Sequence, residues 1–213
     1  MFSCYSVCSV SEFSTTMPII AVAGPTASGK TALSVSLAER FAAEIVNFDS
    51  VQIYRGIEIA TAKPTQEERR GIPHHLIDYV DPNIDYTAAD WAKDAETAIR
   101  DIESRGKRVI LVGGTGFYLR TLCRPLFESP KTDPALREKF RRLHAEHGPE
   151  FLHAMLTQLD PEAAENLPVR DHVRVIRALA VLKQTGKKIS ELQPDRPEPP
   201  ELAARIPLLV LSP

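Results

Sequence analysis

An apolar run that leads directly into a glycine-rich turn constrains this chain more than any other feature. Residues 18–23 are apolar, and the next eight, Gly24-Pro-Thr-Ala-Ser-Gly29-Lys30-Thr31, match the pattern G-x-x-x-x-G-K-[ST] at every position. Residues 29–42 then carry apolar side chains at helical spacing. A buried strand, a tight turn and a helix start in this order indicate a phosphate-binding loop, because the N–H groups of the turn and the helix N-terminus converge on an anion.

The loop pattern predicts what its members bind. Lys30 would add a point charge beside the phosphates, and the Thr31 hydroxyl would hold Mg²⁺. The pattern specifies a diphosphate or triphosphate, which includes ATP and other nucleotides, without specifying a nucleotide. The predicted diphosphate- or nucleotide-binding residues are Gly24, Pro25, Thr26, Ala27, Ser28, Gly29, Lys30 and Thr31.

Strands and helices alternate along the first part of the chain. We expect strands at 18–23, 44–48, 75–80, 108–112 and 206–211, and a helix that begins at Thr87, is capped with Asp90 and ends near Arg105. We expect Trp91 in the core. This alternation predicts an α/β fold whose core is a parallel sheet resembling that of P-loop NTPases.

Two polar residues follow predicted strands. Ligands of open α/β sheets bind beyond the carboxyl ends of the strands, where Asp49 and Thr115 would lie. If the strand order is simple, Asp49 lies beside the first strand. Its carboxylate would bind Mg²⁺ through water, act as a general base, or only cap a turn. Thr115, in Gly113-Gly-Thr-Gly116, would place a hydroxyl over the same crevice, or belong to a plain tight turn.

The pattern changes after about Leu126. Helical periodicity runs over residues 133–192, and a proline-rich linker follows at 193–200. The sequence therefore predicts a P-loop α/β core at 17–125 and 201–213, with a helical insert at 126–200. Residues 1–16 hold seven Ser or Thr and no Lys or Arg, so we expect a disordered extension there.

Charge and composition limit the partners. The net charge is −2, so binding of nucleic acid through bulk positive charge is excluded. Local basic groups remain: Arg137, Lys139, Arg141 and Arg142 on one predicted helix, and Arg174 and Arg177 on another. They form either a solvated face or a contact with nucleic acid phosphates. Three unpatterned cysteines and the lack of a long apolar run predict a cytoplasmic protein that does not enter a membrane.

Several stretches, taken together and in order, resemble the tRNA dimethylallyltransferase (tRNA isopentenyltransferase) family over about residues 18–211. Asp-Ser-x-Gln-Ile-Tyr combined with Thr-Ala-Lys-Pro is the specific part. The stretches are Gly24–Thr31, Asp49-Ser-Val-Gln-Ile-Tyr-Arg55, Ala60-Thr-Ala-Lys-Pro64, Pro73-His-His-Leu-Ile-Asp78, Asp90-Trp91, Val112-Gly-Gly-Thr115 and Arg174-Val-Ile-Arg177-Ala-Leu179.

The resemblance implies transfer of a dimethylallyl group from dimethylallyl diphosphate to the exocyclic amine of the adenosine 3′ of the tRNA anticodon. It implies Asp49, Thr115 and Lys30 as catalytic residues, with Mg²⁺ as cofactor and a monomeric state. The residues that would contact tRNA are Asp49, Ser50, Val51, Gln52, Thr115, Arg137, Val173, Arg174, Val175, Ile176 and Arg177. Family members continue past the position of Pro213, so we expect this chain to bind diphosphate with little prenyl transfer.

Other functions remain open at this point. A P-loop small-molecule kinase would use the same loop for ATP, with arginines from a helical lid. Adenylate dimethylallyltransferase would prenylate free AMP, and an inactive tRNA-binding remnant would not react at all. The helical insert favours tRNA over AMP, and the Asp49–Tyr54 stretch argues against a kinase.

Overall fold

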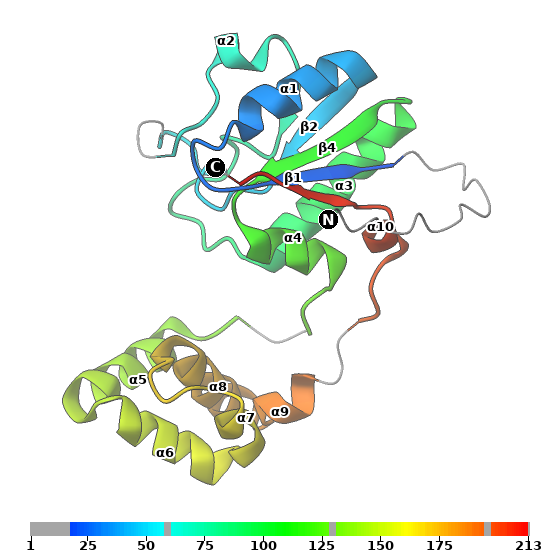
Figure 1. Ribbon diagram of the computed structural model, residues 1–213. Helices are drawn as coiled ribbons and strands as arrows, with labels where there is room; N and C mark the ends of the chain where they lie inside the picture. Colours follow the sequence, from blue (N-terminus) through cyan, green and yellow to red (C-terminus); the bar gives the residue numbers. More distant parts are fainter. Residues whose placement is uncertain (1–17, 58–60, 128–130, 194–196, 213) are drawn as a thin grey trace, which may run out of the picture. The chain divides into compact units, whose positions relative to one another are not determined.

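The computed structural model describes residues 18–57, 61–127, 131–193 and 197–212 (Figure 1). These residues form two compact units. The core unit comprises the described residues up to Arg124 together with those from Pro199 onward, and the helical unit comprises Pro125–Glu198. The extension predicted at 1–16 lies outside the described residues.

The core unit contains a five-stranded sheet in the order β3-β2-β4-β1-β5. All four neighbouring pairs are parallel, with Ala23 opposite Gly113 and Asn47 opposite Val112. The parallel α/β prediction is therefore confirmed. The strands are β1 (Ile20–Ala23), β2 (Ala43–Asn47), β3 (His74–His75), β4 (Arg108–Gly113) and β5 (Leu208–Val210).

The sheet corrects two sequence-based expectations. The strand order is not simple, because β4 pairs with both β1 and β2 and separates them. Asp49 therefore follows a strand that is not adjacent to β1. The strand expected at 75–80 is only His74–His75, and Val80 instead forms an isolated bridge with Tyr54.

Helices cover both faces of this sheet. Three longer helices follow strands β1, β3 and β4 in the chain, namely α1 (Lys30–Phe41), α3 (Ala88–Ser104) and α4 (Gly116–Cys123). Two single-turn helices are α2 (Gln66–Arg69) and α10 (Glu201–Ala204). Val35 and Ala38 of α1 pack with β2 and β4 in one apolar cluster. Ala95 and Ile99 of α3 belong to a second cluster. The sequence did not predict α4 or α10, because short helices carry little periodic signal.

Helix α3 begins as predicted. The N–H of Asp90 donates to the Thr87 hydroxyl at 3.2 Å, and the N–H of Thr87 donates to the Asp90 carboxylate at 3.0 Å. The expected core position of Trp91 is confirmed, since its side chain is fully buried and stacks on Tyr118. Its indole N–H donates to the backbone oxygen of Asn47 at 3.0 Å, which ties α3 to the end of β2.

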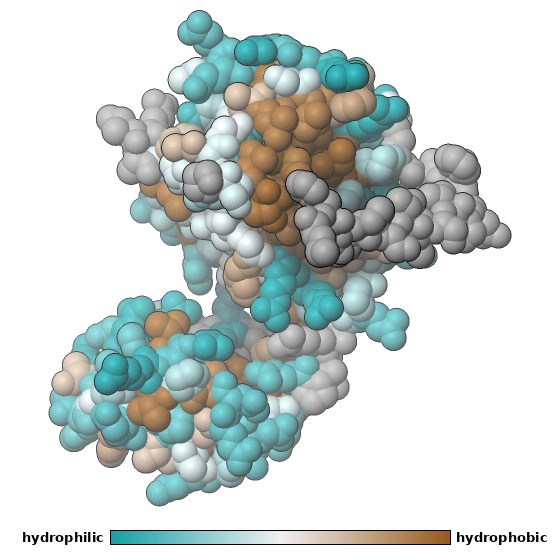
Figure 2. Space-filling view, in the orientation of Figure 1, coloured by the Kyte–Doolittle hydropathy of each residue, from teal (hydrophilic) through white to brown (hydrophobic). Residues whose placement is uncertain are grey.

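Strand β5 is the exposed edge of the sheet. Its residues Leu208, Leu209 and Val210 are 53%, 44% and 58% exposed. Figure 2 shows apolar residues gathered on the core unit in the region of α1, β1 and β5. The edge strand therefore completes the sheet while contributing little to the buried core.

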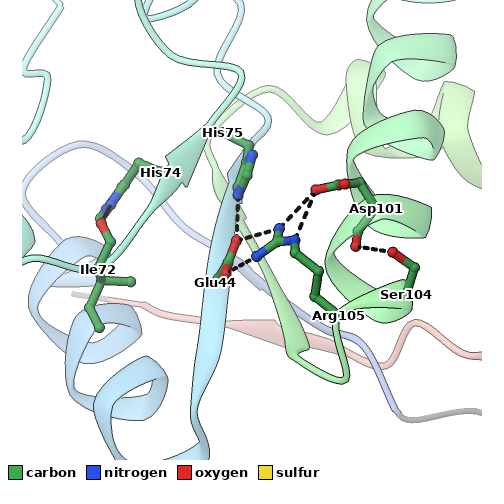
Figure 3. Close-up of polar contacts among 7 residues, drawn as sticks. All are labelled: Glu44, Ile72, His74, His75, Asp101, Ser104 and Arg105. Carbon is green, nitrogen blue, oxygen red and sulfur yellow. Dashed lines mark hydrogen bonds and ion pairs between the residues drawn. The ribbon is translucent and has the colours of Figure 1, made fainter.

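A buried carboxylate links three elements at the amino end of the sheet (Figure 3). Glu44 on β2 accepts a bidentate pair from Arg105, which follows α3, and a contact from His75 on β3 at 2.7 Å. Arg105 also pairs with Asp101 at 2.8 Å. The hydrogen bonds from Arg105, aided by His75 and opposed by burial, lower the pKa of Glu44 from 4.5 to about 2.

This network predicts a pH-dependent stability. A carboxylate whose pKa is lowered on folding stabilises the fold above its unfolded pKa, and this contribution disappears as the pH falls from about 4.5 to about 2. We expect Glu44→Gln to cost about 2 kcal/mol of unfolding free energy at pH 7, allowing for the partly exposed Arg105. The difference in unfolding free energy between this variant and the parent chain, measured by urea titration, should shrink steadily as the pH falls below 5.

Glu96→Gln is the matched control, because the side chain of Glu96 makes an exposed pair with Arg100, one turn along α3, and no other hydrogen bond or ion pair within the described ranges. We expect that substitution to change the unfolding free energy by less than about 0.5 kcal/mol, both at pH 7 and below pH 5. Equal effects of the two substitutions would contradict the role assigned to Glu44.

The helical unit contains α5 (Pro134–His147), α6 (Pro149–Leu159), α7 (Pro161–Glu165), α8 (His172–Thr185) and α9 (Ile189–Leu192). Its core gathers Phe140, Leu152, Leu156, Val175 and Leu179. Pro149 and Pro161 stand at helix starts, where a missing N–H costs nothing. Over the described part of the chain, no helix is long and apolar enough to cross a membrane.

Candidate active site

The predicted phosphate loop lies between the end of β1 and the start of α1. Gly29 precedes α1 with φ +82°, a conformation that glycine adopts without steric cost. At Gly24 a Cβ atom would lie 2.8 Å from both the Leu211 carbonyl oxygen and the Ser28 hydroxyl. The two glycines of the pattern are therefore required by backbone conformation at one end and by close packing at the other.

The loop forms one wall of a cavity of about 440 Å³ in the core unit. The opposite walls come from the ends of β2 and β4 and from the segment around α2, so the cavity lies at the carboxyl edge of the sheet. The lining residues are Thr26, Ala27, Ser28, Gly29, Lys30, Thr31, Ala32, Val35, Asn47, Asp49, Gln52, Thr61, Ala62, Glu68, Arg70, Val112 and Gly113. Loop residues 26–31 and Asp49 therefore face a single space.

Lys30 projects its ammonium group into the loop. The group donates to the carbonyl oxygen of Pro25. Partial burial lowers the pKa of Lys30, and the nearby Asp49 carboxylate opposes that shift. Because burial removes part of the water around the ammonium group, an anion bound beside Lys30 would supply a stabilising interaction in place of that water.

Asp49 is held by the backbone that follows it. Its Oδ1 accepts the N–H of Val51 at 3.0 Å and that of Gln52 at 3.3 Å. Its own N–H donates to the Asn47 side chain at 3.3 Å. Oδ2 has no hydrogen-bond partner among the described residues. The side chain thus caps the turn with one oxygen, and the residue lines the cavity, so the turn-capping role leaves Oδ2 available for the other two roles considered from the sequence.

Thr115 joins the loops that follow β2 and β4. Its hydroxyl accepts the Ser50 N–H at 2.9 Å and donates to the Ser50 hydroxyl at 3.0 Å. Thr115 therefore contacts the turn that carries Asp49 and does not line the phosphate cavity. This geometry gives Thr115 a positioning role for the turn at 49–52.

We expect Thr115→Val to slow the reaction proposed below by about 10- to 100-fold, because a displaced reacting group loses productive geometry. Affinity for diphosphate should remain within about twofold, since the phosphate loop is not touched. Single-turnover rates and calorimetric titration with diphosphate measure the two effects separately. Thr115→Ser keeps the hydroxyl and should restore most of the rate, whereas equal losses in both variants would contradict this role.

The structure adds contacts, and one residue, Lys63, that sequence reasoning did not assign. Gln52 donates its amide to the carbonyl oxygens of Thr61 and Ala62, both at 3.0 Å. Lys63, whose side chain is 6% exposed, donates to Tyr54 and pairs with Asp78. These bonds connect three of the stretches that carry the family resemblance. The position of Lys63 within the stretch Ala60–Pro64 was the sequence signal, and it did not reveal the partner.

The cavity fits a magnesium ion bound together with a diphosphate. Mg²⁺ usually takes one or two protein oxygens and completes its shell with phosphates and water. The Thr31 hydroxyl and the Asp49 carboxylate line the same space and offer such oxygens. Asn47, at the end of β2, adds a third polar side chain to this wall.

The predicted tRNA contacts divide between the two units. Asp49, Ser50, Val51, Gln52 and Thr115 gather in the core unit. In the helical unit, one pocket of about 560 Å³ brings together Arg137, Val173, Arg174, Ile176 and Arg177. Val175 does not line that pocket, because its side chain is 1% exposed and packs in the unit's core.

Known proteins resemble this chain in sequence. The model of the family described as IPP transferase matches residues 52–213. The tRNA dimethylallyltransferase of Geobacter metallireducens is 53% identical over 175 residues, which is 82% of this chain and 57% of that protein. That of Koribacter versatilis is 49% identical over 169 residues, with coverages of 79% and 55%. The chain thus spans little more than half the length of these relatives.

Solved structures resemble it as well. A eukaryotic dimethylallyltransferase, whose crystal structures show it acting on tRNA, matches with a TM-score of 0.70 and 34% identity, over 91% of this chain and 48% of that one. The tRNA isopentenylpyrophosphate transferase of Bacillus halodurans matches with a TM-score of 0.51 and 41% identity, over 80% and 56%. The core unit is thus a P-loop NTPase-like parallel sheet, and the chain belongs to the IPP transferase family.

Proposed function

We propose that the protein transfers a dimethylallyl group from dimethylallyl diphosphate to the exocyclic amine of the adenosine 3′ of the anticodon in tRNA. The observation that carries the proposal is the cavity in which the phosphate loop and the Asp49 carboxylate meet. An anion site beside a carboxylate suits a reaction that releases diphosphate while a nucleophile loses a proton. Membership of the IPP transferase family supports the same reaction.

In this reaction the adenine nitrogen attacks the allylic carbon and forms a C–N bond. The C–O bond to the diphosphate breaks, and its electron pair leaves with the diphosphate. Asp49 accepts the proton that the amine loses, which matters because the amine lone pair is delocalised into the ring. Lys30 and the N–H groups of residues 26–31 stabilise the charge that grows on the leaving oxygens.

Two features of the chain suit the remaining components. Thr31, with Asp49 through water, would hold a Mg²⁺ ion, which supplies positive charge beside the diphosphate when bound. The arginine-lined pocket of the helical unit offers cations for the phosphates of tRNA. We propose a monomer that acts in the cytoplasm, where tRNA is modified.

The test is an assay with labelled dimethylallyl diphosphate in which tRNA, AMP and ATP are offered separately. Because the relatives are longer, the assay uses both this chain and a chimera in which the remaining segment of the Geobacter metallireducens relative follows Pro213. We expect label on tRNA with the chimera and none on AMP. Label on AMP would favour an adenylate dimethylallyltransferase, and phosphate transfer from ATP would favour a small-molecule kinase.

A further inference from the structure

A buried ammonium group lies beside the turn that carries Asp49. The side chain of Lys63 is 6% exposed, donates to the carbonyl oxygen of Tyr54 and pairs with the Asp78 carboxylate. Taking an ammonium ion out of water costs free energy unless a carboxylate and other acceptors replace the lost contacts. Lys63 does not line the phosphate cavity. Its two partners belong to different segments of the chain, so the geometry indicates that Lys63 holds the backbone.

Further contacts join the partners of Lys63 to the turn at residues 49–54. The N–H of Asp78 donates to the carbonyl oxygen of Gln52 at 3.1 Å. The side-chain amide of Gln52 donates to the carbonyl oxygen of Ala62 at 3.0 Å, and Ala62 directly precedes Lys63 in the chain. Lys63 therefore closes a ring of contacts that fastens the turn to the two segments beside it.

Two residues in this ring have an unfavourable backbone conformation. Ala62 and Asp78 have φ of +48° and +59°, in the left-handed region that residues other than glycine rarely adopt. Such conformations cost free energy and persist only where surrounding contacts hold them. Here those contacts include the hydrogen bond between Gln52 and Ala62 and the pair between Lys63 and Asp78. The local arrangement therefore depends on the ring and not on intrinsic backbone preference.

The turn in turn determines where the Asp49 carboxylate lies. Oδ1 of Asp49 accepts the N–H groups of Val51 and Gln52, so the carboxylate follows the backbone of the turn. A shift of the turn would displace this carboxylate within the cavity that Asp49 lines. Because a general base must lie within hydrogen-bond reach of the proton that it removes, a displacement of about 1 Å would slow proton transfer.

We propose that Lys63 is a positioning residue for the transfer reaction, and that it fixes the turn at 49–54 so that Asp49 meets the amine of the substrate. The proposal rests on the proposed function, since it takes Asp49 to be the base. It gives Lys63 no contact with either substrate. Replacing Lys63 should therefore lower the rate of transfer and leave the affinity for diphosphate unchanged.

The first experiment replaces Lys63 with methionine, which keeps an apolar stem of similar length and removes the charge. In single-turnover assays of the chimera, we expect Lys63→Met to slow transfer by about 10- to 100-fold, because the base is displaced. Diphosphate affinity, measured by calorimetry, should stay within about twofold of the parent value. A loss of diphosphate affinity as large as the loss of rate would overturn the proposal.

A second variant and a matched control accompany this one. Asp78→Asn weakens the pair with a small change of shape, and the fold should be retained because the Asp78 side chain is 40% exposed and Asn tolerates a left-handed backbone. We expect it to slow transfer by about 3- to 10-fold. Lys93→Met is the control, because Lys93 is exposed on α3 and does not line the cavity, and it should change neither rate nor affinity. Parent-like rates in both Lys63→Met and Asp78→Asn would contradict the role of Lys63.

A double-mutant cycle separates the positioning of Asp49 from a general structural role. In the chimera that carries Asp49→Asn, Lys63→Met should slow the residual rate by less than about threefold, because the base that Lys63 positions is absent. A general structural role predicts the same factor in both backgrounds. Equal factors would therefore overturn the proposal.

Amide hydrogen exchange of the 213-residue chain gives a readout that does not require transfer. We expect the N–H groups of Val51 and Gln52 to exchange at least about 10-fold faster in Lys63→Met, while exchange in the middle of α3 stays the same. Unchanged exchange at Val51 and Gln52 would overturn the proposal. Absence of transfer by the parent chimera would instead overturn the proposed function, so the two failures are distinguishable.

Discussion

Asp49→Asn is expected to slow prenyl transfer by about 10²- to 10⁴-fold, the usual contribution of a general base. The amide keeps the shape of the side chain, and its oxygen still accepts the N–H groups of Val51 and Gln52, so the turn is preserved. What is lost is the ability of Oδ2 to accept a proton. Single-turnover rates with labelled donor in the chimera measure this loss directly.

Asp81→Asn is the matched control, because Asp81 is an exposed residue whose carboxylate also accepts a nearby backbone N–H, that of Asn83. We expect its rate to remain within about twofold of the parent rate. If Asp49→Asn reacted at a near-normal rate, the proton would have to leave by another route, and the assignment of Asp49 as the base would be wrong.

Lys30→Ala is expected to abolish measurable turnover and to weaken diphosphate binding by about 100-fold or more, because a charge aimed at the leaving group is removed from a partly desolvated site. Calorimetric titration with diphosphate reports binding without the need for transfer. The loop backbone should remain intact, since its conformation depends on Gly24 and Gly29.

Lys107→Ala provides the comparison, since Lys107 is an exposed lysine of the same unit that does not line the cavity. It should leave diphosphate affinity unchanged.

In competition binding we expect dimethylallyl diphosphate to be preferred over ATP. A clear preference for ATP, accompanied by phosphate transfer, would instead support the kinase alternative.

Local patterns were sufficient for much of the fold. The loop at 24–31 is encoded by consecutive residues, and its strand and helix follow from the apolar spacing on either side. The start of α3 is equally local, because Thr87 and Asp90 bond only to each other. Segments of this kind can be predicted from the sequence, because their stabilising contacts lie within a few residues along the chain.

Contacts between residues far apart in the chain could not be predicted from local sequence patterns. The position of β4 between β1 and β2 depends on which strands pair, and strand pairing has no local signature. The stacking of His144 on His172 and the pairing of Lys63 with Asp78 join residues 28 and 15 positions apart. Spacing along one helix or strand cannot predict such contacts.

The sequence alone determined the phosphate loop, the alternation of strands and helices, and Asp49 at the end of a strand. These features require only neighbouring residues, since hydrogen bonds and apolar periodicity over one element specify them. Only the tertiary structure decided that Asp49 and the loop share a cavity despite the intervening strand, and that four arginines and two histidines share another. The physical reason is that a binding site depends on which distant side chains packing brings together, and packing is a property of the whole fold.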